Sequence, residues 1–172
     1  MSEVSIECEN TYQDWNLDIK SITKLTLDIY GFLISQKEIS EECFLRDYAY
    51  NRVFFDVLFC DGNKTHEINK EYRNKDYPAD IITFAVFADS EENERFVLDG
   101  EINLGEIIIA LDKIEVSAKE KGLPKESELA FFIAHGIMHL LGFDHKTEQE
   151  YNFVVKYQKE ALESININYD KV

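Results

Sequence analysis

The 172-residue chain has few cysteines and no pattern that would join them. Cys8, Cys43 and Cys60 are odd in number, lie far apart in the sequence and include no C-x-x-C pair. A disulfide framework normally uses an even set of cysteines in an oxidising compartment. We therefore expect reduced, mostly buried thiols in a cytosolic protein.

The sequence also lacks the apolar stretches of exported and membrane proteins. No apolar run approaches the ~20 residues of a membrane span, and residues 1–5 lack the basic start and apolar core of a secretory signal. There is no internal repeat, low-complexity tract or linker. We expect one cytoplasmic domain, residues 1–172, with no membrane contact.

Basic residues are scarce, with 18 Lys and Arg against 34 Asp and Glu and a net charge of −16. Because neutralisation of phosphates drives most nucleic-acid binding, this balance argues against a broad RNA-binding surface. Any contact with RNA must rest on a metal ion or on a local basic patch. Segment 64–75 is a candidate patch, because its basic residues outnumber its glutamates: Lys64, Lys70, Arg73 and Lys75 against Glu67 and Glu71.

The spacing of apolar residues predicts a mixture of strands and helices. Strands are expected at 4–8, 53–59, 81–87 and 102–111, and helices at 15–34, 64–73, 112–121, 127–141 and 147–164. Segment 36–47 is expected to be a charged connection with a short helix near 43–48, and 89–95 an acidic turn. The order of elements predicts an α+β fold, a small mixed β-sheet covered by helices.

Two helix starts have the spacing of a capping box, in which a side chain three residues into the helix answers the cap residue. These are Asp112 with Glu115 and Thr147 with Glu150. Residues 61–63 are a further candidate cap, for the helix that follows them, and Pro78 indicates a loop after that helix.

Three of the four histidines lie within the twelve residues 134–145. His135 and His139 are four apart in an apolar run, so they share one helix face. Gly142 favours a helix end, beyond which His145 can return toward the first two. Three imidazoles with a fourth position left for water are typical of a catalytic zinc site. The alternative is a set of hydrogen-bonded structural histidines, which the third histidine beyond the glycine disfavours.

The spacing also matches the extended zinc-protease pattern H-E-x-x-H-x-x-G-x-x-H. However, Gly136 stands where a protease has its glutamate base. The only methionines are Met1 and Met138, which excludes a downstream methionine turn. Both departures weaken the protease interpretation.

Residues 135–145, HGIMHLLGFDH, instead resemble the signature of the YbeY family of bacterial rRNA maturation endoribonucleases. Residues 68–84, INKEYRNKDYPADIITF, and 104–107, LGEI, resemble two further blocks of that family. The similarity covers about residues 53–164, while residues 1–50 match weakly. Four positions depart from the family pattern without touching the histidines. Asn74 stands where the family commonly has glycine, Ala79 where threonine is usual, Ala85 in place of a proline and Glu106 in place of an aspartate.

The resemblance implies a zinc-dependent, single-strand-specific endoribonuclease that acts in 16S rRNA maturation and ribosome quality control. By matching positions, it implies one zinc ion held by His135, His139 and His145, with Arg73 used for RNA processing. It also implies an α+β fold with a zincin-like metal-binding helix. The implied partners are single-stranded rRNA precursors and components of the small ribosomal subunit.

The chemistry of these residues suits phosphodiester hydrolysis. Zinc held by histidines lowers the pKa of its water from 15.7 to about 7 and polarises a phosphate oxygen, and the planar fork of Arg73 matches a phosphate. Asp144 adjoins a metal ligand and is expected to orient an imidazole. The alternative for Arg73 is a surface ion pair with Asp76 or Asp80, and no general base is assigned.

Two other classes of function stay open. The first is another zinc hydrolase, such as a zincin-like protease, which the missing base at Gly136 disfavours. The second is a non-catalytic ribosome-assembly factor whose metal only braces the fold. Structural zinc sites usually have four protein ligands, so a site with three disfavours that reading.

Overall fold

A four-stranded mixed sheet organises the computed structural model, which describes residues 2–170. The strands are β1 (Glu3–Asn10), β2 (Arg52–Cys60), β3 (Ile81–Phe84) and β4 (Glu101–Ala110). The helices are α1 (Ile19–Ser35), α2 (Lys37–Glu42), α3 (Gly62–Tyr72), α4 (Leu111–Lys121), α5 (Lys125–Leu140) and α6 (Glu148–Ser164). Two short 3-10 helices complete the described elements, Phe44–Asp47 and Glu92–Glu94.

The strand order is β1-β2-β4-β3. β1 and β4 both run parallel to β2, whereas the short edge strand β3 runs antiparallel to β4. The sheet is therefore mixed and flanked by helices, which confirms the predicted α+β class.

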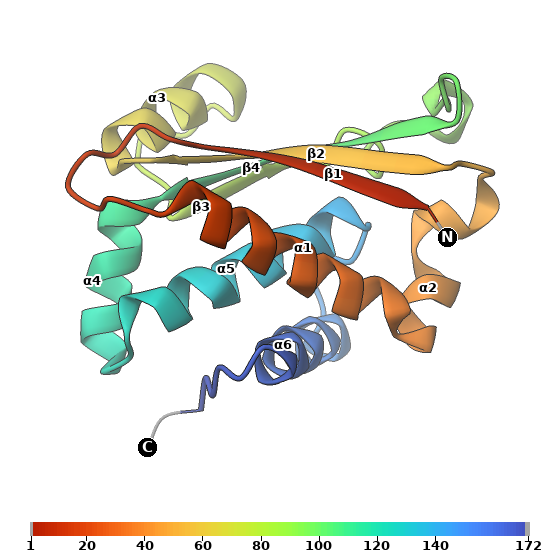
Figure 1. The fold of residues 1–172 in the computed structure, drawn as a ribbon. Helices are drawn as coiled ribbons and strands as arrows, with labels where there is room; N and C mark the ends of the chain where they lie inside the picture. Colours follow the sequence, from red (N-terminus) through yellow and green to blue (C-terminus); the bar gives the residue numbers. More distant parts are fainter. Residues whose placement is uncertain (1, 171–172) are drawn as a thin grey trace.

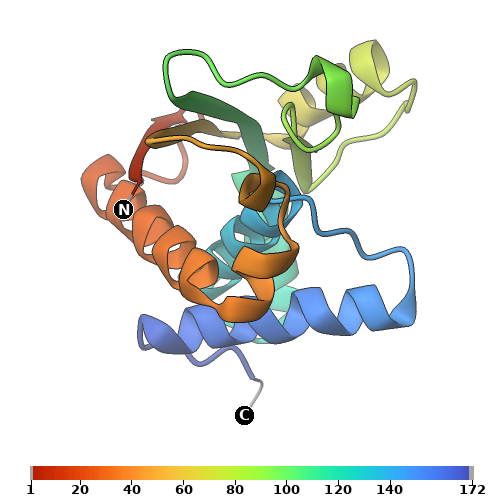
Figure 2. The same cartoon turned by 90° about the vertical axis from the view of Figure 1, so that its right-hand side faces the viewer.

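The helices are distributed unequally over the two faces of the sheet (Figure 1). α1 and α5 pack side by side against one face, and α6 packs against both of them to form a third layer (Figure 2). α3 lies on the opposite face (Figure 1). Along β2, alternate side chains are almost fully buried under α1 and α5 because successive side chains of a strand point to opposite faces: Val53, Phe55, Val57 and Phe59.

Several predicted helix ends shift, most of all in the helix predicted at 15–34, which begins at Ile19 after the N-cap Asp18. Two further differences concern α2 and β3. The charged connection predicted at 36–47 contains the helix α2. Ile39 is the only buried residue of this helix, so the sequence shows no apolar periodicity from which the helix could be predicted. The strand predicted at 81–87 ends at Phe84, where the N–H of Val86 turns back to the Phe84 carbonyl (2.9 Å). The apolar residues after Phe84 are those of a turn, in which Ala85 and Phe87 are buried.

The predicted caps had mixed outcomes. Thr147 Oγ1 accepts a hydrogen bond from the Glu150 N–H (3.1 Å), and Asp61 caps α3, as expected. The capping box predicted for Asp112 and Glu115 was wrong, because α4 begins one residue earlier, at Leu111, and has no side-chain cap. Asp112 Oδ1 accepts instead from the Gly62 N–H (2.8 Å), so this carboxylate joins the start of α4 to the start of α3.

All three cysteines are free in the structure. Cys43 and Cys60 are buried, and burial raises the pKa of the Cys60 thiol to about 12, so it stays protonated and unreactive near neutral pH. Within residues 2–170, no helix combines the length and the apolar character needed to cross a membrane.

Candidate metal centre

Helix α5 lies so close to the sheet that only glycine fits at the crossing. A Cβ atom at Gly136 would meet the Ile107 side chain of β4 at 2.8 Å. Gly136 is buried, and Ile133 and Ile137, which lie near it on α5, are fully buried as well. The position that carries the base in the protease pattern therefore faces the sheet, and a glutamate there would require α5 to move away from β4.

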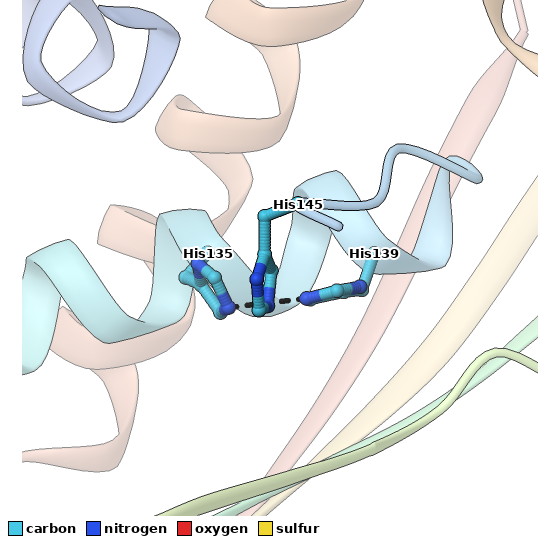
Figure 3. Close-up of side chains that lie close together, drawn as sticks. All are labelled: His135, His139 and His145. Atoms are coloured by element: carbon cyan, nitrogen blue, oxygen red, sulfur yellow. Dashed lines mark hydrogen bonds between the residues drawn. The ribbon is translucent and has the colours of Figure 1, made fainter. Parts of the chain in front are cut away.

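His135 and His139 lie on the partly exposed flank of α5, and His145 reaches them from the loop beyond the helix (Figure 3). The ring centroids are 4.6 Å apart for His135 and His139, and 5.1 Å apart for each of them and His145. The Nε2 atoms of His135 and His139 are separated by 3.1 Å. One nitrogen from each of the three rings lies within 4.8 Å of the others. The three histidines singled out by spacing are thus brought together.

The return of His145 depends on the end of α5. Gly142 has φ of +97° and its N–H donates to the His139 carbonyl (2.9 Å), while the Phe143 N–H donates to the Met138 carbonyl (3.0 Å). This pair of bonds is a Schellman motif, the helix ending that glycine favours. A Cβ at Gly142 would lie 2.1 Å from the Phe44 ring, so the position excludes a side chain for two independent reasons.

The two helical imidazoles are kept neutral. Burial, together with smaller contributions from the neighbouring His139 and His145, lowers the pKa of His135 to about 4. Burial also lowers the pKa of His139, with smaller contributions from His145 and Arg73. Because a histidine must be unprotonated to bind a metal ion, both rings are ready to serve as ligands at neutral pH.

Gln158 of α6, which is almost fully buried, determines which nitrogen of His135 is free. Its Nε2 donates to the Phe131 carbonyl (3.0 Å), which fixes the orientation of the amide and points Oε1 at His135 Nδ1 (3.3 Å). An amide oxygen can only accept, so Nδ1 must carry the proton and Nε2 is left with its lone pair facing the cluster. The role of Gln158 was not predicted from the sequence, where the only signal is a single amide within the apolar stripe of residues 151–162.

Arg73, at the C-terminal end of α3, lines the same hollow as the three histidines, together with Ile81 and Thr83 of β3. Its Nη2 donates to the Thr83 carbonyl (3.1 Å), and its guanidinium carbon lies 5.6 Å from the centre of the Phe84 ring. No carboxylate within residues 2–170 comes within 4.0 Å of this guanidinium, so the surface ion pair with Asp76 or Asp80 was the wrong alternative.

A left-handed residue directs the chain away from α3 just after Arg73. Asn74 has φ of +58°, a conformation that glycine adopts freely and asparagine tolerates better than most residues. This geometry explains how asparagine stands at a position where the resemblance leads one to expect glycine.

Three other candidates lie outside the hollow. The Asp144 carboxylate accepts from the His145 backbone N–H (2.8 Å) and pairs with Lys146 (3.5 Å), so it holds the loop, and its orienting of an imidazole stays a prediction. Glu106 lines a separate groove on the other face of the sheet, where burial and then the nearby Asp56 raise its pKa. His66 contacts Asp76 (2.7 Å).

The donor set fits a zinc ion. Zinc accepts neutral imidazole nitrogens, and catalytic sites use three protein ligands and keep one position open. The cluster within residues 2–170 consists of three histidines whose nitrogens can approach one point. The lining of the hollow also includes no carboxylate that could serve as a fourth protein ligand.

Comparison with known proteins identifies relatives across most of the chain. A family model described as Endoribonuclease YbeY matches residues 7–166, which includes most of the N-terminal part that resembled the family only weakly. Proteins named Endoribonuclease YbeY include one from Bacillus cereus, 33% identical over 88% of this chain and 96% of its own length. Another, from Malacoplasma penetrans, is 36% identical over 73% of this chain and 79% of its own length.

A solved structure supports the fold independently. The solution structure of a Thermotoga maritima protein aligns with 98% of this chain and 100% of its own, with a TM-score of 0.53 and 22% identity. At that identity it bears on the fold alone. The family match over residues 7–166 and the identities to the relatives show that this chain belongs to the YbeY endoribonuclease family.

Proposed function

We propose that this protein is a zinc-dependent, single-strand-specific endoribonuclease that acts in 16S rRNA maturation and ribosome quality control. Residues 1–172 would form one metal-dependent hydrolase domain that works in the cytoplasm with components of the small ribosomal subunit. The observation that carries the proposal is the shared hollow of Arg73 and the three histidines, in a chain whose relatives are named endoribonucleases.

Each residue of the hollow has a role that follows from its chemistry. His135, His139 and His145 would hold the ion, with His135 presenting Nε2 because Gln158 occupies its Nδ1. A zinc ion bound by three histidines supplies a Lewis acid that makes water acidic and polarises a phosphoryl oxygen.

Arg73 would bind the phosphate. Its guanidinium donates one N–H to the Thr83 carbonyl. This bond fixes the plane of the guanidinium and leaves its other N–H groups for phosphate oxygens. The contact with the Phe84 ring restrains the same plane from its face. This local positive charge answers the objection raised by the net charge of −16, because the phosphate meets a cation within the hollow and not a broad basic surface.

The decisive experiment separates metal binding from RNA contact. In Arg73→Glu we expect loss of RNA processing, measured on a 16S rRNA precursor, with unchanged zinc content measured on the purified protein. Arg46→Glu is a matched control, since Arg46 is exposed on a 3-10 helix and does not line the hollow. Loss of zinc from Arg73→Glu would show that Arg73 is structural.

Two further measurements distinguish the other classes of function. Cleavage of peptides in place of RNA would favour a zinc protease, which the burial of Gly136 against Ile107 argues against. Unfolding of the protein on chelation, without any RNA cleavage by the zinc-loaded form, would favour an assembly factor with a structural metal.

A further inference from the structure

A second, mainly apolar hollow of about 240 Å³ adjoins the candidate metal centre. Its wall is formed by aromatic and aliphatic side chains of α5 and α6, among them Phe132, Val154 and Val155. Tyr151 and Lys121 also line it, and the Tyr151 side chain is 54% exposed, so its ring is accessible from solvent. Neither the metal ligands nor the phosphate contact account for this hollow.

The two hollows share part of their lining. Ile81, His135 and His145 line both, whereas Arg73 and Thr83 line only the polar one. A phosphate held between Arg73 and the histidines would therefore lie beside the entrance of the apolar hollow. The nucleoside attached to that phosphate is the part of the substrate that reaches it.

The polar groups around the apolar hollow are already engaged. Both ends of the Gln158 amide are used, by His135 and by the Phe131 carbonyl. The Lys121 ammonium pairs with the buried carboxylate of Glu128 at 2.9 Å. The wall thus offers apolar and aromatic surface, with few free donors or acceptors to read the edge of a base.

We propose that this apolar hollow receives one unpaired nucleobase of the RNA, next to the phosphate bound by Arg73. The inference rests on the proposed function and deepens it by naming a substrate subsite. Every base has a π-face, so contacts of this kind tolerate sequence differences. A base that is paired in a duplex cannot leave its partner to enter the hollow without a cost in unpairing and unstacking. The hollow therefore gives a physical reason for single-strand specificity with little preference among bases.

The test measures binding, so that it does not depend on cleavage. A fluorescein-labelled single-stranded oligodeoxyuridylate keeps the bases and phosphates of the ligand, and an oligomer of abasic units of the same length keeps only the phosphates. Fluorescence anisotropy with the zinc-loaded protein gives both affinities. We expect the wild-type protein to bind the base-bearing oligomer about 5- to 150-fold more tightly, the range for one base–aromatic contact.

Variants of the wall make the test specific. Val155→Trp should fill the hollow and abolish the discrimination between the two oligomers, and Tyr151→Ala should reduce it, while Tyr151→Phe keeps the ring and should retain it. Val116→Trp is the matched control, since Val116 is 55% exposed on α4 and lines neither hollow. Zinc content and unfolding temperature, measured on each variant, exclude general damage.

Contrary outcomes are clear. Equal affinity of the wild-type protein for the two oligomers, no binding of either, or unchanged discrimination in Val155→Trp would each overturn the base subsite. A protein that discriminates between the two oligomers as expected but cuts no rRNA precursor would contradict the proposed function and still support the base subsite. A protein that cuts RNA but does not discriminate would do the reverse.

Discussion

The three histidines of the candidate metal centre are held in two different ways. His135 and His139 are partly buried on α5, a helix packed against the sheet on one side and α6 on the other. His145 is exposed in the loop that follows. The helical pair is positioned by the core of the protein, whereas the third histidine is positioned by one turn at Gly142 and by the Asp144 carboxylate.

The helical histidines and the loop histidine therefore differ in what positions them and in what a mutation near them should change. The helical pair is neutral and pre-oriented, because burial lowers both pKa values and Gln158 fixes the tautomer of His135. His145, on the loop, adds a third imidazole to the cluster and forms part of the wall of both hollows. Changes to the helix should therefore act on metal affinity through the core, and changes to the loop through the turn.

The largest expected effect is the loss of a helical ligand. His139→Ala should lose bound zinc and all RNA processing, because two ligands cannot retain the ion that three hold. Metal analysis of the purified variant and cleavage of an rRNA precursor measure both. Cleavage that persists in a metal-free preparation would refute the zinc mechanism.

The second-largest effect is expected from a change in the turn at Gly142. Gly142→Ala places a Cβ against the Phe44 ring and forces a side chain into positive φ, so we expect a loss of about 2–5 kcal/mol in unfolding free energy and weaker zinc binding. Denaturant unfolding and chelator competition measure the two effects. Gly122→Ala is a matched control, because Gly122 also has positive φ (+68°) but a Cβ there meets nothing within 4 Å. If both variants bound zinc normally, the turn would not position His145.

The buried state of His135 predicts a pH dependence for the metal-free protein. Its pKa falls from 6.5 in the unfolded chain to about 4 in the fold, so the unfolded state takes up the proton more readily. The free energy of unfolding should fall by about 3 kcal/mol as the pH drops from 6.5 to 4. Thermal unfolding of wild type and His135→Gln across this range checks it, since the variant should lack that part of the decline. Parallel curves would contradict the assignment.

A smaller effect is expected from the residue that orients His135. Gln158→Leu should weaken zinc binding about 10- to 100-fold, as is typical when the hydrogen-bond partner of a metal-binding histidine is removed. Chelator competition measures the affinity, and nitrogen NMR of the metal-free protein should show a mixture of His135 tautomers. Asp144→Asn is the contrasting variant on the loop, and its effect should be smaller because its carboxylate contacts backbone and Lys146. Equal losses in the two variants would remove the distinction between helix and loop.

Much of the candidate site was readable from the sequence because its signals are local. The spacing of His135 and His139 follows from helix geometry, and the role of Gly142 follows from the left-handed end that glycine permits. The strands at 53–59 and 102–111 were predicted closely because β-forming residues fill them. The α2 helix and the early end of β3 were not predicted, since one buried isoleucine and one turn leave almost no pattern.

The sequence by itself determined the three histidines, the helix that carries two of them and the α+β class, because periodicity and glycine stops act over a few residues. Only the tertiary structure decided that Gln158 selects the tautomer of His135 and that Arg73 shares a hollow with the histidines. The apolar hollow between α5 and α6 also became visible only there. These contacts join residues that lie far apart in the chain, and they depend on how helices pack against one another and on the sheet, which no local pattern encodes.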